Sequence, residues 1–517
     1  MVAMNYFVNE NIFTMNSGTE FSAIKRLRLF HNHNLPAKIL TRNYNPQLIA
    51  DLKRENMKYS DILNMYDYFQ ETVAIEAKNV NVRYVDVIDK YRYHIEGIDS
   101  NESLIKHKGN IIGRVQIAPT TVGLVGTIEF YSAAGDLLAK DIWDRRGFKS
   151  STQYFHPDGS LGPQVFFDLN GKAKLEITRM NINGVLSQTM WKLLDYKGGV
   201  RRFDTENELF AFFLQELSQN EEVVYINDRP SLMAAVASAI TAKGRWEFLH
   251  SVHTPNGQTV GASRNVVDYM RPLFTVYNES FDGIIVATEE QKNEIDKFFK
   301  FKNVVVLPDT YADDVRLNRT EREKTIVYLG RIAPEKNPID ALEILSRLRT
   351  SWPEARLDFY GYASSQNVQK QMEDRVKELG LRDVVNFRGY HSQEEVAKAL
   401  DTAIAAISVA EGEAFGMSAL QAMAHGVPVV GYKVKYGLSE LIDDKRNGRL
   451  VPYASLDGAA QALSDTMTGN MVQAAYDKAQ KFNEMAAWMY WKQDIGNRKM
   501  NQLKIFLLEV KNSVVLS

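Results

Sequence analysis

Two carboxylates, Glu411 and Glu413, stand between an apolar run and a segment of good helix formers. The apolar run, residues 403–410, has the length of a buried strand, and residues 417–424 favour a helix that ends before the next apolar strand. Ligands of open parallel sheets bind where the strands end, and the N–H groups at the start of a helix after Gly416 favour an anion. A carboxylate beside an anion site predicts a ligand that is part phosphate and part polyol.

The segment around Glu413 resembles the signature of retaining nucleotide-sugar glycosyltransferases of the family numbered four, which have two Rossmann-like domains in the GT-B fold. Their pattern is Glu, seven residues and Glu, with Phe-Gly inside it and an Ala-x-x-x-Gly-x-Pro-Val-Val tail. In this chain the first position is Glu413 and the second is Gln421. The resemblance implies that Glu413 holds the donor sugar, that position 421 faces the ribose hydroxyls, and that the helix start binds the donor through Gly416, Met417 and Ser418.

Gln421 is a departure from the family pattern. An amide can hydrogen-bond a hydroxyl, but without the charge assistance that makes a carboxylate's bonds stronger. The chain is then either an active enzyme or a non-catalytic subunit that stabilises an active paralogous glycosyltransferase, and both interpretations stay open.

Arg331 and Lys336 directly follow the strand predicted at residues 325–330. Taken alone, the two residues favour an interpretation as surface cations at a helix entrance. In the family, Gly-Arg, four residues and Lys supply two cations to the donor diphosphate, and the resemblance implies this role here. Fixed cations stabilise the negative charge that builds on a leaving phosphate. Because such a pair replaces a metal, and no Asp-x-Asp follows an apolar strand, we expect no metal and no cofactor besides the UDP-sugar donor.

Residues 80–200 alternate in the way that antiparallel strands do, at 114–117, 126–130, 164–167 and 174–177, with turn signals such as Asn170-Gly171 between them. The stretch 141–159 resembles the insertion of a narrow branch of the family, the wall teichoic acid α-glycosyltransferases and the enzymes that glycosylate serine-rich or Ser-Asp-repeat adhesins. In that branch the insertion serves oligomerisation or acceptor binding. An exposed sheet edge can pair with another subunit or with an extended polymer.

Two histidines, His250 and His253, end the strand predicted at 246–250. In the same branch a His-x-x-His element places a histidine beside the transferred sugar. We prefer His253 for this role and keep His250 as the second candidate. Structural histidines are the competing interpretation, and a metal site lacks a nearby third ligand.

Two further positions are donor-site candidates. Gly18 and Thr19 lie between a predicted strand and helix, at a loop that faces the acceptor and the donor phosphates in GT-B enzymes. Tyr390 follows a strand and turn that resemble the uracil-binding segment of relatives, where it could stack on the base. A tight turn and an ordinary strand-end aromatic are the competing interpretations.

The composition bounds the class of protein. The 517 residues predict two or three domains, and 62 basic against 64 acidic residues favour neither nucleic acid nor a membrane surface. The absence of cysteine excludes disulfides and thiolate chemistry. We find no apolar run of 18 residues and no signal peptide, so we expect a cytoplasmic protein, with a peripheral contact at the inner face of the cell membrane left open.

Together these patterns predict an α/β protein, and the resemblance implies the GT-B fold. We expect an acceptor-side Rossmann-like domain at 1–75 and 201–312, a β-rich insertion at 76–200, a nucleotide-sugar-binding domain at 313–480, and a helix at 481–517 that crosses back to the first domain. The predicted activity is transfer of a hexose or N-acetylhexosamine, GlcNAc or glucose, from a UDP-sugar to hydroxyls of a serine-rich adhesin or wall teichoic acid. The predicted assembly is a homo-oligomer or a pair with a paralogous glycosyltransferase.

Overall fold

The computed structural model describes residues 3–75, 87–255, 257, 264–318 and 321–493. The chain divides into two compact units. The first contains Met1–Thr14 and Leu35–Arg245, and the second contains Met15–Asn34 and Trp246–Ser517. The junction of the predicted insertion at 76–86 and most of the predicted C-terminal helix, residues 494–517, lie outside the described residues.

The first unit begins with parallel strands. β1 (Met4–Asn9) pairs with β14 (Val223–Asn227) on one side and with β2 (Ala37–Thr41) on the other, and β2 pairs with β3 (Ile62–Asn64). These strands are apolar and almost wholly buried, as expected for a parallel sheet. The helices of this part are α2 (Leu48–Arg54), α3 (Met65–Phe69), α5 (Glu206–Asn220) and α6 (Met233–Ser238).

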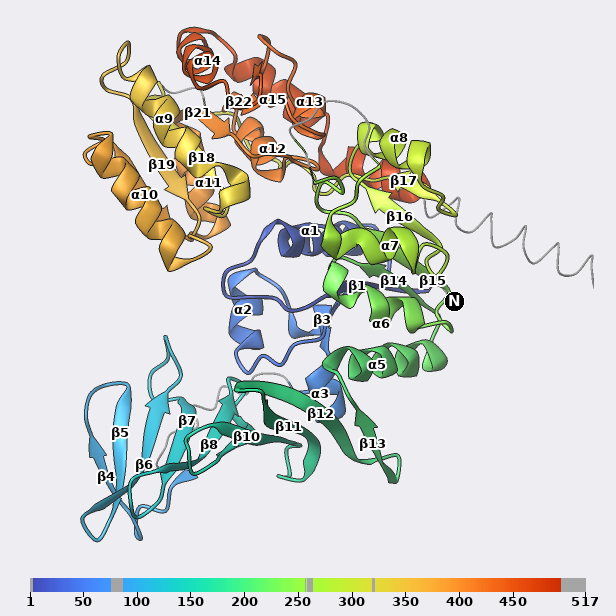
Figure 1. Ribbon diagram of the computed structural model, residues 1–517, viewed down its shortest axis with the longest axis vertical. Coiled ribbons are helices and arrows are strands. Elements are labelled where there is room, and N and C mark those ends of the chain that lie inside the picture. Colours follow the sequence, from blue (N-terminus) through green and yellow to red (C-terminus); the bar gives the residue numbers. More distant parts are fainter. Residues whose placement is uncertain (1–2, 76–86, 256, 258–263, 319–320, 494–517) are drawn as a thin grey trace, which may run out of the picture. The chain divides into compact units, whose positions relative to one another are not determined.

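The predicted insertion is a ten-stranded antiparallel sheet in which consecutive strands pair (Figure 1). All four strands predicted in this region fall within strands of the sheet. Ile105, Val115 and Ile128 form part of a small buried cluster on it. The strands are β4 (His94–Gly97), β5 (Glu102–His107), β6 (Asn110–Ile117), β7 (Val125–Tyr131), β8 (Leu137–Asp144), β9 (Phe148–Phe155), β10 (Leu161–Phe167), β11 (Ala173–Ile182), β12 (Val185–Tyr196) and β13 (Gly199–Phe203).

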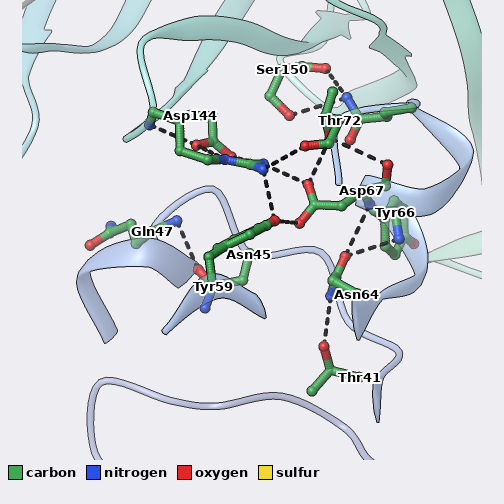
Figure 2. A network of polar contacts seen from close by, with 12 residues as sticks. Thr41, Asn45, Gln47, Tyr59, Asn64, Tyr66, Asp67, Thr72, Asp144 and Ser150 are labelled. Carbon is green, nitrogen blue, oxygen red and sulfur yellow. Dashed lines mark hydrogen bonds and ion pairs between the residues drawn. The ribbon is translucent and has the colours of Figure 1, made fainter. Parts of the chain in front are cut away.

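A buried polar network attaches this sheet to the α/β part of the first unit (Figure 2). Arg146, in the turn between β8 and β9, donates to Asp144 Oδ1 at 2.8 Å and to Asp67 Oδ1 at 2.6 Å. It also donates to the Tyr59 hydroxyl at 2.7 Å and to the Thr72 carbonyl at 3.0 Å. Since the Arg146 side chain is only 2% exposed, these bonds supply the compensation that a buried charge requires.

The second unit contains two sets of parallel strands. One set is β15 (Gly244–Phe248), which enters this unit at Trp246, with β16 (Gly283–Val286) and β17 (Val304–Val306). The other is a six-stranded sheet in the order β20-β19-β18-β21-β22-β23. The six strands are β18 (Glu323–Leu329), β19 (Arg356–Tyr360), β20 (Val385–Gly389), β21 (Ala403–Ser408), β22 (Val429–Tyr432) and β23 (Gly448–Val451).

The helices of the second unit follow the expected βαβ pattern closely. α9 and α14 pack side by side, and their buried faces join the core of the six-stranded sheet. The helices are α1 (Gly18–Asn32), α7 (Arg271–Thr275), α8 (Glu289–Phe298), α9 (Pro338–Leu348), α10 (Gln366–Glu378), α11 (Gln393–Thr402), α12 (Met417–Ala424), α13 (Leu438–Leu441), α14 (Leu456–Thr468) and α15 (Val472–Gln480).

Candidate functional site

The strand β21 and the helix α12 place Glu413 in the loop between them, as the sequence predicts. The Glu413 carboxylate forms an ion pair with Lys336, whose Nζ lies 2.8 Å from Oε2. The two side chains are 35% exposed for Lys336 and 18% for Glu413, so both remain in reach of solvent. One acid and one cation of the predicted donor site therefore lie in direct contact.

The backbone of Glu413 is fixed from both sides by one segment, residues 435–437. The Glu413 N–H donates to the Lys435 carbonyl at 2.7 Å, and the N–H groups of Tyr436 and Gly437 donate to the Glu413 carbonyl at 2.7 and 2.8 Å. A Cβ on Gly437 would lie 2.0 Å from the Phe415 carbonyl oxygen, which requires glycine at this close approach. The loop that carries Glu413 is consequently well defined.

The block from Arg331 to Lys336 folds around the end of β18. The Tyr328 hydroxyl lies 3.5 Å from the Arg331 carbonyl and 3.4 Å from the Lys336 carbonyl. The Glu335 carbonyl accepts from Glu411 N–H at 3.0 Å, which brings the block beside the Glu413 loop. The Arg331 guanidinium, 48% exposed, pairs with the Glu335 carboxylate. The structure thus joins Lys336 to Glu413 and gives Arg331 a different carboxylate partner.

The N-termini of α1 and α12 lie next to each other, and α12 follows the Glu413 loop directly. Gly416, with φ +97°, is the residue before α12, and it has no side chain that could cap the first N–H groups of the helix. A Cβ on Gly18 at the start of α1 would lie 3.4 Å from Met417 Sδ, so the two helix N-termini are adjacent within the second unit. Helix N-termini favour anions, which is the physical property that a diphosphate site requires.

Tyr390 and Gln421 each form a hydrogen bond with another residue of the second unit. The Tyr390 hydroxyl accepts from the Asn16 N–H at 3.0 Å, just before α1. Gln421 Nε2, on the second turn of α12, donates to Gln393 Oε1 at 2.8 Å, and this contact is exposed. Tyr390 therefore helps to hold the loop that precedes Gly18.

The two histidines occupy buried positions with different partners. His250 Nδ1 lies 2.5 Å from Asp309 Oδ1. His253 is completely buried, stacks on Phe274, and has Nδ1 3.3 Å from the Tyr436 hydroxyl. Burial lowers the pKa of His253 to about 4, so its imidazole is neutral at neutral pH.

Several residues of this region carry no sequence signal that we recognised. They are Lys435, whose carbonyl accepts from Glu413 N–H, Glu294 on α8, and Asp309, the partner of His250. Gly257 and Gly412 belong with them, since a Cβ on Gly257 would lie 2.8 Å from the Gly412 Cα. Close backbone contact between loops far apart in the chain could be inferred from these glycines only with a structure in hand.

Among the described residues no group of three or more His, Cys, Asp and Glu side chains could hold a metal ion. Within the same residues, helices that combine the length and the apolar character needed to cross a bilayer are absent.

Residues 309–486 match the model of the family described as glycosyl transferases group 1. The UDP-N-acetylglucosamine–peptide N-acetylglucosaminyltransferase GtfA subunit of Streptococcus gordonii is 26% identical over 340 residues, which are 63% of each protein. The poly(ribitol-phosphate) alpha-N-acetylglucosaminyltransferase of Staphylococcus aureus is 22% identical over 90% of this chain and 93% of that protein. Similarity to the second of these proteins therefore extends through the insertion.

Solved structures confirm the predicted fold class. The pneumococcal O-GlcNAc transferase GtfA, in complex with UDP and GlcNAc, superposes with a TM-score of 0.81 at 20% identity over 96% of this chain and 99% of that one. TarM of S. aureus superposes with a TM-score of 0.77 at 19% identity over 95% and 98%. Residues 309–486 are thus similar to the group 1 glycosyltransferases, and the chain has the GT-B fold, as the GtfA and TarM structures do.

Proposed function

We propose that this protein is a retaining glycosyltransferase that moves GlcNAc or glucose from a UDP-sugar to hydroxyls of a cell-surface acceptor, a serine-rich adhesin or wall teichoic acid. The observation that carries the proposal is the contact of Lys336 with Glu413 beside the adjacent N-termini of α1 and α12. A cation, an acid and two helix starts match the diphosphate and the hydroxyls of a nucleotide sugar.

Each side chain has a defined task in this proposal. Lys336 and Arg331 exchange their present carboxylate partners for the diphosphate oxygens of the donor and stabilise the charge that develops as the sugar–phosphate bond breaks. Glu413 then accepts hydrogen bonds from the sugar hydroxyls. The acceptor hydroxyl attacks the face from which the phosphate leaves and gives its proton to that phosphate, which retains the anomeric configuration.

The histidines differ in how they contribute. His253 is buried against Tyr436 and acts on the sugar site through the segment that holds Glu413. His250, bonded to Asp309, is the other histidine candidate for the sugar. Gly18, Gly416, Met417 and Ser418 line the anion site through their backbone, and Tyr390 supports it through Asn16.

The direct test is sugar transfer by the purified chain, with radiolabelled UDP-GlcNAc and UDP-glucose each offered a serine-rich peptide, poly(ribitol phosphate) and poly(glycerol phosphate). We expect transfer to one acceptor class, with an α-linked product by NMR. Glu413→Ala and Arg331→Ala should abolish transfer and keep the wild-type circular dichroism spectrum. Full turnover by both variants would remove the assignment. Lys398→Ala, which breaks an exposed pair with Glu394, is the control.

Gln421 favours a second candidate function, a non-catalytic subunit that stabilises an active paralogous glycosyltransferase. Its amide lies at the position where the family has a glutamate, and it is bonded to Gln393. Such a subunit would neither hydrolyse nor transfer from any UDP-sugar. If the chain is an enzyme, Gln421→Glu should tighten UDP binding several-fold in calorimetry, because a carboxylate makes stronger bonds to ribose hydroxyls.

The proposed setting is the cytoplasm, with a peripheral contact at the inner face of the cell membrane as the second candidate. The proposed assembly is a homo-oligomer or a pair with a paralogous chain. The sedimentation velocity of the purified protein, with and without acceptor, measures the assembly directly.

A further inference from the structure

A cluster of buried polar side chains lies behind the Glu413 loop, on the side of α8. The Glu294 carboxylate binds Lys435 Nζ at 2.9 Å through Oε1 and accepts from the Tyr436 hydroxyl at 3.1 Å through Oε2. The side chains of Lys435 and Glu294 are 2% and 5% exposed. Tyr436 and His253 are completely buried. The proposed chemistry uses neither Glu294 nor Lys435.

Such a cluster is costly unless every member is paired. A buried ammonium or carboxylate loses its hydration and regains stability only through well-placed partners. Here the Glu294 carboxylate accepts one hydrogen bond at each oxygen, from the neighbouring residues Lys435 and Tyr436. Glu294 consequently fixes both the position and the rotation of this pair of residues.

The same two residues hold Glu413 through their backbone. The carbonyl of Lys435 accepts from Glu413 N–H, and the N–H of Tyr436 donates to the Glu413 carbonyl, each at 2.7 Å. Lys435 N–H in turn donates to the Gly257 carbonyl at 2.8 Å. A displacement of residues 435 and 436 would therefore displace Glu413 with them.

His253 completes the cluster in one tautomer. The Tyr436 hydroxyl has a single proton, and its bond to the Glu294 carboxylate uses it. The short approach of His253 Nδ1 to the same hydroxyl is then an Nδ1–H donation to the Tyr436 oxygen. This assignment leaves His253 Nε2 as an acceptor, and that atom is buried without a hydrogen-bond partner among the described residues.

We infer that Glu294 is a positioning residue for Glu413: it anchors Lys435 and Tyr436, whose backbone sets the place of the carboxylate that binds the donor sugar. The inference rests on the proposed function in that it gives Glu413 a sugar to hold. It assigns no contact between Glu294 and the substrate. Glu294 acts instead through two residues that lie 141 and 142 positions further along the chain.

Amide hydrogen exchange tests the mechanical part of the inference without any substrate. In Glu294→Gln, we expect the amides of Glu413, Tyr436 and Gly437 to exchange at least tenfold faster, while the amides of β19 keep their wild-type rates. Asp296→Asn on the same helix is the matched control, since Asp296 pairs with Lys292 on the exposed face. Unchanged exchange at Glu413 and Tyr436 in Glu294→Gln would overturn the inference.

Donor binding and turnover test the functional part. Glu294→Gln should bind UDP within twofold of wild type, because the nucleotide does not need Glu413, and should lose at least tenfold in kcat with the UDP-sugar. Equal loss of UDP affinity and kcat would indicate general damage to the fold and would refute a positioning role. If Glu294→Gln fails to fold, the double variant Glu294→Gln with Lys435→Gln, which leaves no unpaired buried ammonium, replaces it in both experiments.

Measurements on the wild-type protein distinguish a failure of the proposed function from a failure of the inference about Glu294. A wild type that neither binds nor turns over any UDP-sugar contradicts the proposed function, and the exchange experiment still decides whether Glu294 anchors Glu413. An active wild type whose Glu294→Gln variant matches it in kcat contradicts the role of Glu294 alone.

Discussion

The buried His253 makes the stability of the protein depend on pH in a defined window. Its pKa is about 4 in the folded protein, lowered first by burial, against about 6.5 in an unfolded chain. Between these values the unfolded chain binds more protons, so the free energy of unfolding falls as the pH is lowered. The contribution of neutral His253 is complete above pH 6.5 and is lost as the pH approaches 4.

The magnitude follows from the two pKa values. From pH 7.5 to pH 5.0, linkage predicts a loss of about 2 kcal/mol from this one residue. Other groups titrate in the same range, so the quantity to measure is a difference between proteins. His253→Gln should be less stable than wild type at pH 7.5, and this gap should shrink by about 2 kcal/mol at pH 5.0.

Urea unfolding at the two pH values measures the difference in the free energy of unfolding between wild type and His253→Gln. The control is His94→Gln on the exposed strand β4, for which this difference should not change with pH. Histidine ring NMR provides a second measurement. The resonance that disappears in His253→Gln should titrate near pH 4 and not near pH 6.5. A gap that stays constant, together with titration near pH 6.5, would refute the buried neutral imidazole and its bond to Tyr436.

Two further predictions concern how the loops and the insertion are held. Arg146→Met should lower the free energy of unfolding by about 3–5 kcal/mol, because it leaves Asp144 and Asp67 buried without their cation. Urea unfolding tests this, with Arg271→Met as the control at an exposed site. A loss of less than about 1 kcal/mol, the size expected for a surface ion pair, would contradict it. Gly437→Ala should lower both the melting temperature and the kcat, because the new methyl group would overlap the Phe415 carbonyl; a variant with wild-type melting and turnover would show that the Glu413 loop can adapt.

The sequence predicts the elements around Glu413 closely, because local signals agree there. The predicted helix 417–424 has the observed bounds of α12, since good helix formers are followed at once by Gly426 with φ +72°. The strands of the insertion are equally visible, because polar and apolar residues alternate and Gly-containing turns separate them. Their pairing into one ten-stranded sheet is a long-range property that no local pattern contains.

Some boundaries fail for identifiable reasons. The small residues at 231–242 favour a helix, but α6 ends at Ser238. Residues between α6 and β15 form turns, and Lys243 N–H donates to the Val223 carbonyl just before β15 begins. The apolar residues Ile12 and Phe13 favour a continuation of the first strand, but β1 ends at Asn9. Ile12 is nevertheless buried outside the sheet, so its apolar side chain signals burial and not strand structure.

In the candidate site, too, some features can be predicted from the sequence and others cannot. The resemblance to the family names Lys336, Glu413 and the two histidines as candidates, and their roles stay predictions. The partners of these residues are not readable from local patterns, because Tyr436 lies 183 positions from His253 and Glu413 lies 77 positions from Lys336. Which acid faces which base is decided by tertiary packing.

The central claim is that Lys336 and Glu413 form the donor site of a transferase. Its most direct test is the rate of transfer from a UDP-sugar by Lys336→Met beside wild type and Lys398→Met. Loss of a cation that stabilises the leaving phosphate should cost about 100-fold to 1,000-fold in kcat, with the control unchanged. A Lys336→Met protein that transfers sugar at the wild-type rate would contradict the account.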